Sequence, residues 1–383
     1  MTGFPRGSTA IVSAATYGIG ENPGFTSMEL AVRASLLALG EASLAPSDVD
    51  AVFIGLPDDF LSGLTLAEYL GIRPRVLNNN RTGGSAFLTH VALAAQALAS
   101  GSCDVALIAY GSNQRSAAGK LVSAMRQSPF EAPYNLPRPM GAYALATARY
   151  MHEYGLKREM LGEVAISARK WAQLNPEAFS RDDLSMDEYL SSRQLVSPLG
   201  VRDCCLVTDG AAAVVMVRAD RARDLARRPA YLLGAGEATT HRDIGSMPDF
   251  TVTAAVDSGA RAFAAAGLSP EDVDVVELYD AFTINTILFL EDLGFCRKGE
   301  GGAFVSEGRI APGGRLPVNT NGGGLSCVHP GMYGLFTIVE SARQIMGVAG
   351  DRQVAGVNVA LAHGNGGELS HQATVLMGSG DAL

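Results

Sequence analysis

The sequence lacks the features that mark membrane proteins, nucleic-acid-binding proteins and disulfide-stabilised secreted domains. It has no run of about 18 uninterrupted apolar residues, so no membrane-spanning segment is expected. It has no block of Lys or Arg, and its net charge is −9, which argues against nucleic-acid binding. The five cysteines are odd in number and include the adjacent Cys204 and Cys205, a pattern typical of reduced intracellular thiols.

Targeting signals and common cofactor motifs are also missing. The start has no signal-peptide pattern and the C-terminus no receptor-read address, so a cytoplasmic location is expected. Gly18-Ile-Gly20 follows a strand-like run, but Pro23 breaks the helix that a dinucleotide fingerprint requires. No Cys/His set has metal-ligand spacing and no Gly-x-Ser-x-Gly elbow is present. We therefore expect no metal and no permanently bound cofactor.

What the chain does contain fits a well-buried enzyme. Its 383 residues are 47% apolar and 18% charged, and they suffice for two domains or one duplicated core. The 44 glycines indicate many tight turns between short elements rather than a helical bundle.

Four features of the first part of the chain recur, in the same order, in the last part. The first copy holds a Pro-initiated turn with a β-branched strand, an Asn/Gly turn, an amphipathic helix and an apolar strand ending in Gly. These pairs are 44–53 with 268–277, 78–84 with 319–324, 85–100 with 332–346, and 105–111 with 358–364. Alternating strands and helices predict an α/β fold with one sheet in each half.

A segment of different character separates the two copies. It contains the only tryptophan, Trp171, and a Pro-rich basic stretch at 133–139. The apolar run that starts at Asp209 predicts a strand that returns to the first half. We therefore expect an N-terminal half formed by 1–111 and 209–230, an inserted loop domain over 112–208, and a C-terminal half over 231–383. Such an insertion usually covers an active-site mouth or binds part of a ligand.

Arg81 lies where the surrounding residues predict a nucleophile. The segment 76–87 ends an apolar stretch, turns on Asn and Gly, and opens a long helix. Such a turn presents one side chain at a helix N-terminus, where backbone N–H groups favour developing negative charge. A Cys or Ser there would be an acyl acceptor, whereas an arginine cannot give up its proton. The site architecture is kept while the reaction has changed.

Five segments together resemble the thiolase superfamily along essentially the whole chain, most closely its sterol-carrier-protein-x-like, lipid-transfer branch. They are 78–86, 203–213 with Asp-Gly-Ala-Ala, 277–282 with Tyr-Asp-Ala-Phe, 321–334 with His-Pro, and 362–367. The resemblance implies the thiolase fold, in which duplicated βαβαβ halves form five layers, αβαβα.

The same resemblance shows three departures from thiolase chemistry. The acyl-accepting cysteine of the family falls at Arg81, its second, acid/base cysteine at His363, and the Asn or His of its third motif at Tyr279. Only the histidine of the His-Pro motif, His329, stays as the family has it. Without the nucleophilic cysteine no acyl-enzyme forms, so ping-pong thiolysis is not expected.

The chain is most similar to the cysteine-less, thiolase-like aldolases of steroid side-chain degradation. Such enzymes cleave a β-hydroxyacyl-CoA by retro-aldol reaction, and the resemblance assigns tyrosines of these motifs, Tyr279 and Tyr333, to proton transfer. His329 and Gly-turn amides would hold the enolate oxygen, His363 would be a secondary acid/base, and Arg81 an electrostatic stabiliser. A tyrosine base would need a neighbouring cation or donor to lower its pKa from about 10.

Each of these residues also has a purely structural interpretation. His329 would cap a helix, Tyr333 and Tyr279 would pack in the core, His363 would be a core histidine, and Arg81 would plug a dead site. Two other functions also stay open, a thiolase-type acyltransferase with a different nucleophile and a non-catalytic lipid carrier or scaffold. For the acyl group, a steroid, an aromatic and a branched aliphatic acid all stay open.

The resemblance also implies ligands and partners. CoA would enter as part of the substrate, with its phosphates against basic residues of the inserted segment. The candidate contacts are Arg115, Lys120, Arg126 and Arg138. A homodimer is implied, with the strand near Val105–Tyr110 pairing across the two-fold axis. A small OB-fold, zinc-ribbon acyl-CoA-binding protein is the expected further partner.

Overall fold

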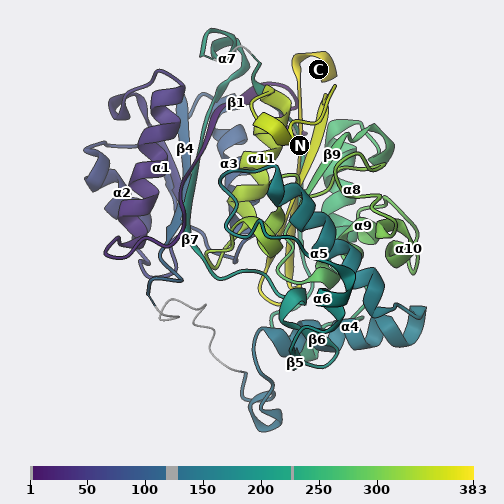
Figure 1. Ribbon diagram of the computed structural model, residues 1–383. Helices are drawn as coiled ribbons and strands as arrows, with labels where there is room; N and C mark the ends of the chain where they lie inside the picture. Colours follow the sequence, from purple (N-terminus) through teal and green to yellow (C-terminus); the bar gives the residue numbers. More distant parts are fainter. Residues whose placement is uncertain (1–2, 118–127, 226–227) are drawn as a thin grey trace.

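The computed structural model describes residues 3–117, 128–225 and 228–383 (Figure 1). Nine strands form one mixed sheet in the order β3-β2-β4-β7-β1-β8-β11-β10-β9. Their bounds are β1 Thr9–Gly20, β2 Ala51–Ile54, β3 Val76–Asn78, β4 Val105–Ser112, β7 Asp209–Arg218, β8 Ala230–Thr239, β9 Val275–Leu278, β10 Val359–Gly366 and β11 His371–Gly378. A separate two-stranded sheet pairs β5 (Gln194–Val196) with β6 (Leu199–Gly200).

The two halves of the sheet are joined, which differs from the expectation of one sheet per half. Five strands of the first half, β3-β2-β4-β7-β1, meet four strands of the second half where β1 pairs with β8. This junction is short, because only Ala10 with Tyr231 and Ile11 with Ala230 are in register. The predicted duplication is therefore present, but its two sheets are continuous at one edge.

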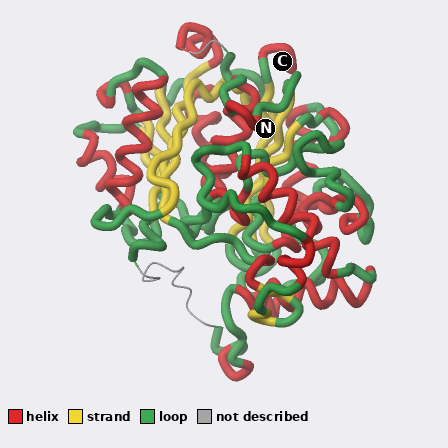
Figure 2. The backbone as a smooth tube through the Cα atoms, in the orientation of Figure 1, coloured by secondary structure: helices red, strands yellow, loops and turns green. Residues whose placement is uncertain are grey.

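Helices cover both outer faces of the sheets and fill the space between them, which gives the five layers expected of the fold (Figures 1 and 2). Helices α1 and α2 lie on the outer face of the first half, α8 and α9 on that of the second, and α3 and α11 between the halves. The bounds are α1 Ser27–Glu41, α2 Ser62–Leu70, α3 Ala86–Ala99, α4 Met140–Tyr154, α5 Arg158–Gln173, α6 Met186–Leu190, α7 Ala219–Leu225, α8 Ala255–Ala266, α9 Thr283–Asp292, α10 Gly301–Val305 and α11 Gly334–Met346. Short 3-10 turns are η1 Pro46–Asp48, η2 Ala132–Tyr134, η3 Val201–Asp203, η4 Ile244–Ser246, η5 Pro270–Asp272, η7 Gly350–Arg352 and η8 Gly380–Ala382, and η6 (Gly323–Cys327) is a π-helical turn.

The repeated sequence features fold into equivalent elements. Each Pro-initiated turn becomes a 3-10 turn followed by a short buried strand, η1 with β2 and η5 with β9. The two amphipathic stretches become α3 and α11, and the apolar strands become β4 and β10. Both β4 and β10 are buried along their whole length, as strands between two helical layers should be.

The strand predicted to pair across a two-fold axis is not available for that contact. Strand β4 is bonded on one side to β2, in parallel, and on the other to β7, antiparallel. A strand with neighbours on both sides has no free edge for a second chain. The homodimer itself stays a prediction, but β4 does not form its interface.

The segment between β4 and β7 holds α4, α5, α6 and the small β5–β6 sheet. Strand β7 returns to the first half by pairing with β1 and β4. The division at 111, 208 and 230 stays a prediction. Across the described ranges, no helix combines the length and apolar character that crossing a bilayer requires.

Candidate active site

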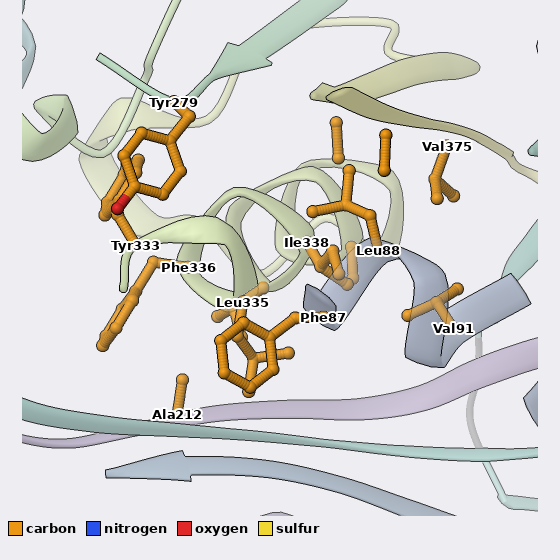
Figure 3. Close-up of a cluster of buried hydrophobic side chains, with 14 of the residues drawn as sticks. Phe87, Leu88, Val91, Ala212, Tyr279, Tyr333, Leu335, Phe336, Ile338 and Val375 are labelled. Carbon is orange, nitrogen blue, oxygen red and sulfur yellow. The ribbon is translucent and has the colours of Figure 1, made fainter. Parts of the chain in front are cut away.

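Tyr279, His329 and Tyr333 form one cluster of rings. The ring centroids of Tyr279 and His329 lie 5.5 Å apart, those of Tyr279 and Tyr333 5.7 Å apart, and those of His329 and Tyr333 6.2 Å apart. Figure 3 shows the two tyrosine rings side by side at one end of the buried apolar cluster that α3 and α11 share. Two phenols and an imidazole, separated by up to 54 positions in the sequence, therefore face one another.

Three different elements position these rings. Tyr279 directly follows β9, and its backbone N–H donates to the carbonyl of His363 on the neighbouring strand at 3.0 Å. Tyr333 is the N-cap residue of α11. His329 lies on the turn between η6 and α11, where its N–H donates to Thr208 Oγ1 at 3.0 Å. All three rings thus come from the C-terminal half, and Thr208, directly before β7, holds the turn that carries His329.

Both phenols keep their protons in the resting protein. Tyr279 donates to the carbonyl of Gly331 at 3.3 Å, and Tyr333 donates to Asn321 Oδ1 at 3.0 Å. Burial raises the pKa of each tyrosine well above its usual value. The prediction of a tyrosine base required a neighbouring cation that lowers the tyrosine pKa. The pKa of each tyrosine is instead raised. In this state the phenols are hydrogen-bond donors rather than bases.

His329 has the opposite character. Burial lowers the pKa of His329 to about 4, so its imidazole is neutral near pH 7. Its Nε2 atom is enclosed and has no hydrogen-bond partner among the described residues. A buried polar atom without a partner needs an explanation, and a catalytic role is one. His329 therefore offers a free ring nitrogen next to the two phenols.

The Asn/Gly turn before α3 reaches the same cluster. A Cβ atom at Gly84 would stand 1.9 Å from Cε2 of Tyr279, and a Cβ atom at Gly334 would stand 2.0 Å from the carbonyl oxygen of Gly84. Only glycine permits approaches this close. The N-terminal ends of α3 and α11 thus meet at the tyrosine rings.

Arg81 lies on this turn, but its side chain is turned toward another part of the surface. The guanidinium donates to the backbone carbonyls of Leu56 at 2.6 Å and Pro57 at 3.0 Å, and Arg81 is exposed. This turn therefore reaches the rings at Gly84, while the guanidinium of Arg81 is held by the loop after β2.

His363 is separated from the ring cluster, although its carbonyl binds the N–H of Tyr279. Its ring packs against Phe289 of α9 with centroids 4.6 Å apart, and its two nitrogens bond to Thr374 Oγ1 at 2.9 Å and to Gln372 Oε1 at 3.0 Å. Burial lowers the pKa of His363 to about 3. With both nitrogens occupied and the ring in the core, His363 is not placed to act as the secondary acid/base.

Arg138, a predicted contact for CoA phosphate, is occupied by carboxylates. Its Nη2 lies 2.8 Å from Glu368, 3.1 Å from Asp243 and 3.1 Å from Glu131. Three carboxylates around the half-buried guanidinium would repel a phosphate, so Arg138 does not suit a contact with CoA. Its role is structural, because it ties the loop before α4 to the loops near η4 and β11.

The other predicted CoA contacts have different outcomes. Arg115 is partly exposed, and its Nε forms an ion pair with Glu21. Lys120 and Arg126 lie outside the described residues. Contact of these residues with CoA stays a prediction.

Asp280 is a member of the site that sequence reasoning missed. Its carboxylate accepts the N–H groups of Gly324 at 2.6 Å and Leu325 at 3.4 Å, so it fixes the π-helical turn η6 that leads to His329. A Cβ atom at Gly323 would stand 2.0 Å from Asp280 Oδ2, which explains the glycines of this turn. The signal was present in the sequence, since Asp280 directly follows Tyr279 in the Tyr-Asp-Ala-Phe segment.

Asp280 gives a testable dependence of stability on pH. Burial raises its pKa from 3.8 to about 7, so the folded protein holds a proton that the unfolded chain has lost between these values. The free energy of unfolding should therefore fall as the pH rises through this interval and level off above it. Asp280→Asn removes this contribution. Between pH 4 and pH 8, the free energy of unfolding of Asp280→Asn should therefore rise by on the order of 4 kcal/mol relative to that of the unchanged protein.

Urea unfolding at a series of pH values measures this difference, with the exposed Asp257→Asn as the matched control. Parallel stability curves for Asp280→Asn and the unchanged protein would show that the Asp280 carboxyl is not held protonated.

Comparison with known proteins agrees with this geometry. Residues 236–379 match the family model "Thiolase C-terminal domain-like". The chain is 33% identical to a steroid side-chain-cleaving aldolase of Thermomonospora curvata, over 94% of this chain and 96% of that protein. It is also 33% identical to the 17-hydroxy-3-oxo-4-pregnene-20-carboxyl-CoA lyase of Mycobacterium tuberculosis (93% and 95%), and 31% identical to an acetyl-CoA acetyltransferase of Methanothermobacter thermautotrophicus (94% and 96%).

Solved structures give the same result. The Ltp2-ChsH2(DUF35) aldolase superposes with a TM-score of 0.89 and 32% identity, over 98% of both chains. Human mitochondrial 3-ketoacyl-CoA thiolase shares the fold with a TM-score of 0.74 at 16% identity, over 97% of this chain and 99% of that one. The chain therefore belongs to the thiolase superfamily, in its group of thiolase-like aldolases.

Proposed function

We propose that this protein is a carbon–carbon lyase that cleaves a β-hydroxyacyl-CoA by retro-aldol reaction, without a covalent acyl-enzyme. The products are a ketone or aldehyde and a shorter acyl-CoA. The observation that carries the proposal is the convergence of Tyr279, Tyr333 and His329 beside a turn that has Arg81 where thiolases have their nucleophile. The aldolase and the lyase at 33% identity support it.

The reaction needs one proton acceptor and donors for the enolate oxygen. The hydroxyl proton leaves as the Cα–Cβ bond breaks, the electron pair of that bond forms the enolate of the thioester, and a proton then returns to Cα. Because the phenols stay protonated and Nε2 of His329 is free, we assign His329 to accept the hydroxyl proton and Tyr279 to donate to the enolate oxygen. Tyr333 is fully enclosed, and its ring supports those of Tyr279 and His329.

This assignment exchanges the roles that the sequence interpretation gave to the tyrosines and the histidine. A phenol with a pKa above its usual value is a poor base until it has lost its proton. A neutral imidazole can accept a proton at once. The exchange rests on the direction of the pKa shifts and on the unpartnered Nε2 atom.

CoA enters as part of the substrate, and we propose a small DUF35-type, OB-fold and zinc-ribbon protein as the partner. The structural relative with a TM-score of 0.89 is itself the Ltp2-ChsH2(DUF35) aldolase, which supports this partner. Degradation of a steroid or other lipid side chain is the metabolic setting that the named relatives favour.

The test is incubation with a panel of β-hydroxyacyl-CoAs, with and without a DUF35 partner. We expect release of a ketone or aldehyde together with a shorter acyl-CoA, detected by mass spectrometry. Intact protein sampled during turnover should show no mass increase on any side chain. A covalently attached acyl fragment, or free CoA without carbon–carbon cleavage, would contradict the proposal.

An acyltransferase is the second candidate, because one relative at 31% identity is an acetyl-CoA acetyltransferase. A cysteine nucleophile for such a reaction would have to be a thiolate, and burial raises the pKa of every cysteine in this chain. Cys103 reaches about 11, and Cys204 and Cys296 each reach about 12. None of these thiols is activated, which favours the aldolase.

A further inference from the structure

The turn from His329 to Tyr333 controls the placement of all three rings. His329 and Tyr333 lie at its two ends, and Tyr279 donates to the carbonyl of Gly331 in its middle. Residues 329–333 belong to no helix or strand, so their backbone N–H and C=O groups depend on partners from other parts of the chain. The groups that supply these partners therefore decide where the rings stand.

Tyr110 of β4 supplies two of these partners with one hydroxyl. The hydroxyl donates to the carbonyl of Pro330 and accepts the N–H of Met332 at 3.1 Å. Tyr110 is inaccessible to solvent, and its ring packs against Phe87 of α3 with centroids 5.0 Å apart. The phenol is thus fixed within the first half of the chain and reaches across to a turn of the second half.

Thr208, directly before β7, holds the start of the same turn. Its Oγ1 accepts the N–H of His329 at 3.0 Å, and its own N–H donates to the His329 carbonyl at 3.3 Å. Together with Tyr110, Thr208 binds four backbone groups of the turn. None of these four bonds involves a ring of the cluster, so all four can persist while the rings react.

The bond from Tyr279 to Gly331 is different, because Tyr279 is one of the reacting groups. A phenol has one proton, so Tyr279 releases the Gly331 carbonyl when it donates to the enolate oxygen. The middle of the turn then loses a bond, and the bonds of Tyr110 to Pro330 and Met332, on either side of Gly331, keep it in place. A turn that moved would carry the ring of His329 with it, and a displacement of about 1 Å can lower a rate by two orders of magnitude.

We propose that Tyr110 is a positioning residue, which holds the 329–333 turn while Tyr279 exchanges the Gly331 carbonyl for the enolate oxygen. The inference rests on the proposed function and assigns a residue outside the five segments that carry the family resemblance. Tyr110 has in the first copy the position that His363 has in the second, and each binds a backbone group of the site, Tyr110 through its hydroxyl and His363 through its carbonyl.

Tyr110→Phe tests this role, because it keeps the ring against Phe87 and removes the hydroxyl. We expect kcat for a β-hydroxyacyl-CoA to fall roughly 10- to 100-fold, while KM and the Kd of the product acyl-CoA change less than about threefold. The pH profile of kcat/KM should keep its shape, since His329 remains the acceptor. Tyr150→Phe is the matched control, because Tyr150 is similarly buried and its hydroxyl binds Glu291, and this variant should keep kcat within about threefold of the starting value.

Amide hydrogen exchange tests the same contact without turnover. In Tyr110→Phe, the N–H groups of Met332 and His329 should both exchange at least about tenfold faster than in the unchanged protein or in Tyr150→Phe. The N–H of His329 is the decisive one, because its partner Thr208 is unchanged in this variant. Its exchange therefore rises only if the turn itself becomes mobile.

Three results would overturn the role of Tyr110. They are an unchanged kcat in Tyr110→Phe, equal losses of kcat in Tyr110→Phe and Tyr150→Phe, and a His329 N–H that stays protected while that of Met332 exchanges faster. If the unchanged protein cleaves no β-hydroxyacyl-CoA, the proposed function fails, and the exchange of His329 decides separately whether Tyr110 holds the turn.

Discussion

Tyr279→Phe is expected to lower kcat/KM for a β-hydroxyacyl-CoA by roughly two to three orders of magnitude, the effect of removing one fixed donor from an oxyanion site. The ring stays in place, because it is held between Gly84, His329 and Tyr333 by packing alone. Only the hydroxyl is lost, and it makes a single bond of 3.3 Å to Gly331. The free energy of unfolding should therefore change by no more than about 1 kcal/mol.

Two other tyrosines provide the comparison. Tyr150→Phe removes a buried hydroxyl that binds Glu291, and it should lower stability while leaving kcat/KM within about threefold of the starting value. Tyr333→Phe should lower kcat/KM less than Tyr279→Phe, because the Tyr333 hydroxyl is enclosed and bound to Asn321. Substrate binding by the Tyr279 and Tyr333 double variant, measured by calorimetry, should persist. A double variant with unchanged kcat/KM would support a lipid carrier or another site.

Much of the fold could be predicted from the sequence because the same order of elements occurs in both halves of the chain. The paired features over 44–111 and 268–364 fixed the order of strands and helices, and each became the same element in both halves. The junction of β1 with β8 was not accessible, because it involves two residue pairs with no pattern of their own. The error at β4 has a similar cause, since an apolar strand does not reveal on which side its neighbours lie.

The sequence predicts the site residues that belong to a recognisable motif. It does not predict the side-chain directions that depend on packing between distant segments. Tyr279, His329 and Tyr333 each sit in a short recognisable segment, and the structure brings them together. The sequence does not show that Arg81 turns toward Leu56, because that direction depends on a loop 25 residues away.

The predicted role of His363 was wrong for the opposite reason. Its motif is clear, but the alternation of side chains along β10 turns its ring away from the cluster, toward Phe289. The neighbouring Gly364 instead faces α3, where a Cβ atom would stand 2.5 Å from Leu88. A motif therefore identifies the strand, while the register of that strand decides which residues can act.

The directions of the pKa shifts were the hardest feature to predict from the sequence, because they depend on how deeply each group is buried. A tyrosine base and a histidine base require the same residues and differ only in which group is free of its proton. Burial raises the pKa of both phenols and lowers that of the imidazole, which is why we propose the histidine base. The resulting difference is open to a direct kinetic test.

His329→Gln should lower kcat/KM by roughly two to four orders of magnitude, because an amide can occupy the place of the imidazole but cannot accept a proton. The pH dependence identifies the acceptor. With a pKa of about 4, His329 is in its accepting form above that value, so kcat/KM of the unchanged protein should fall only as the pH approaches 4, and this decline should be absent in His329→Gln. Asp280 is a neighbouring group with a pKa of about 7, so it titrates within the same pH series. Measuring the pH profile of Asp280→Asn separates its contribution to kcat/KM from that of His329.

The alternative makes the reverse prediction at high pH. If a phenolate were the base, kcat/KM would keep rising with pH from 7 to 10, because more of the tyrosine would lose its proton. If His329 is the base, kcat/KM stays level over that range, since the acceptor is already free and the phenols must remain protonated to hold the enolate oxygen. A rise that persists in His329→Gln and disappears in Tyr279→Phe would return the base to Tyr279 and leave His329 as a donor to the oxyanion.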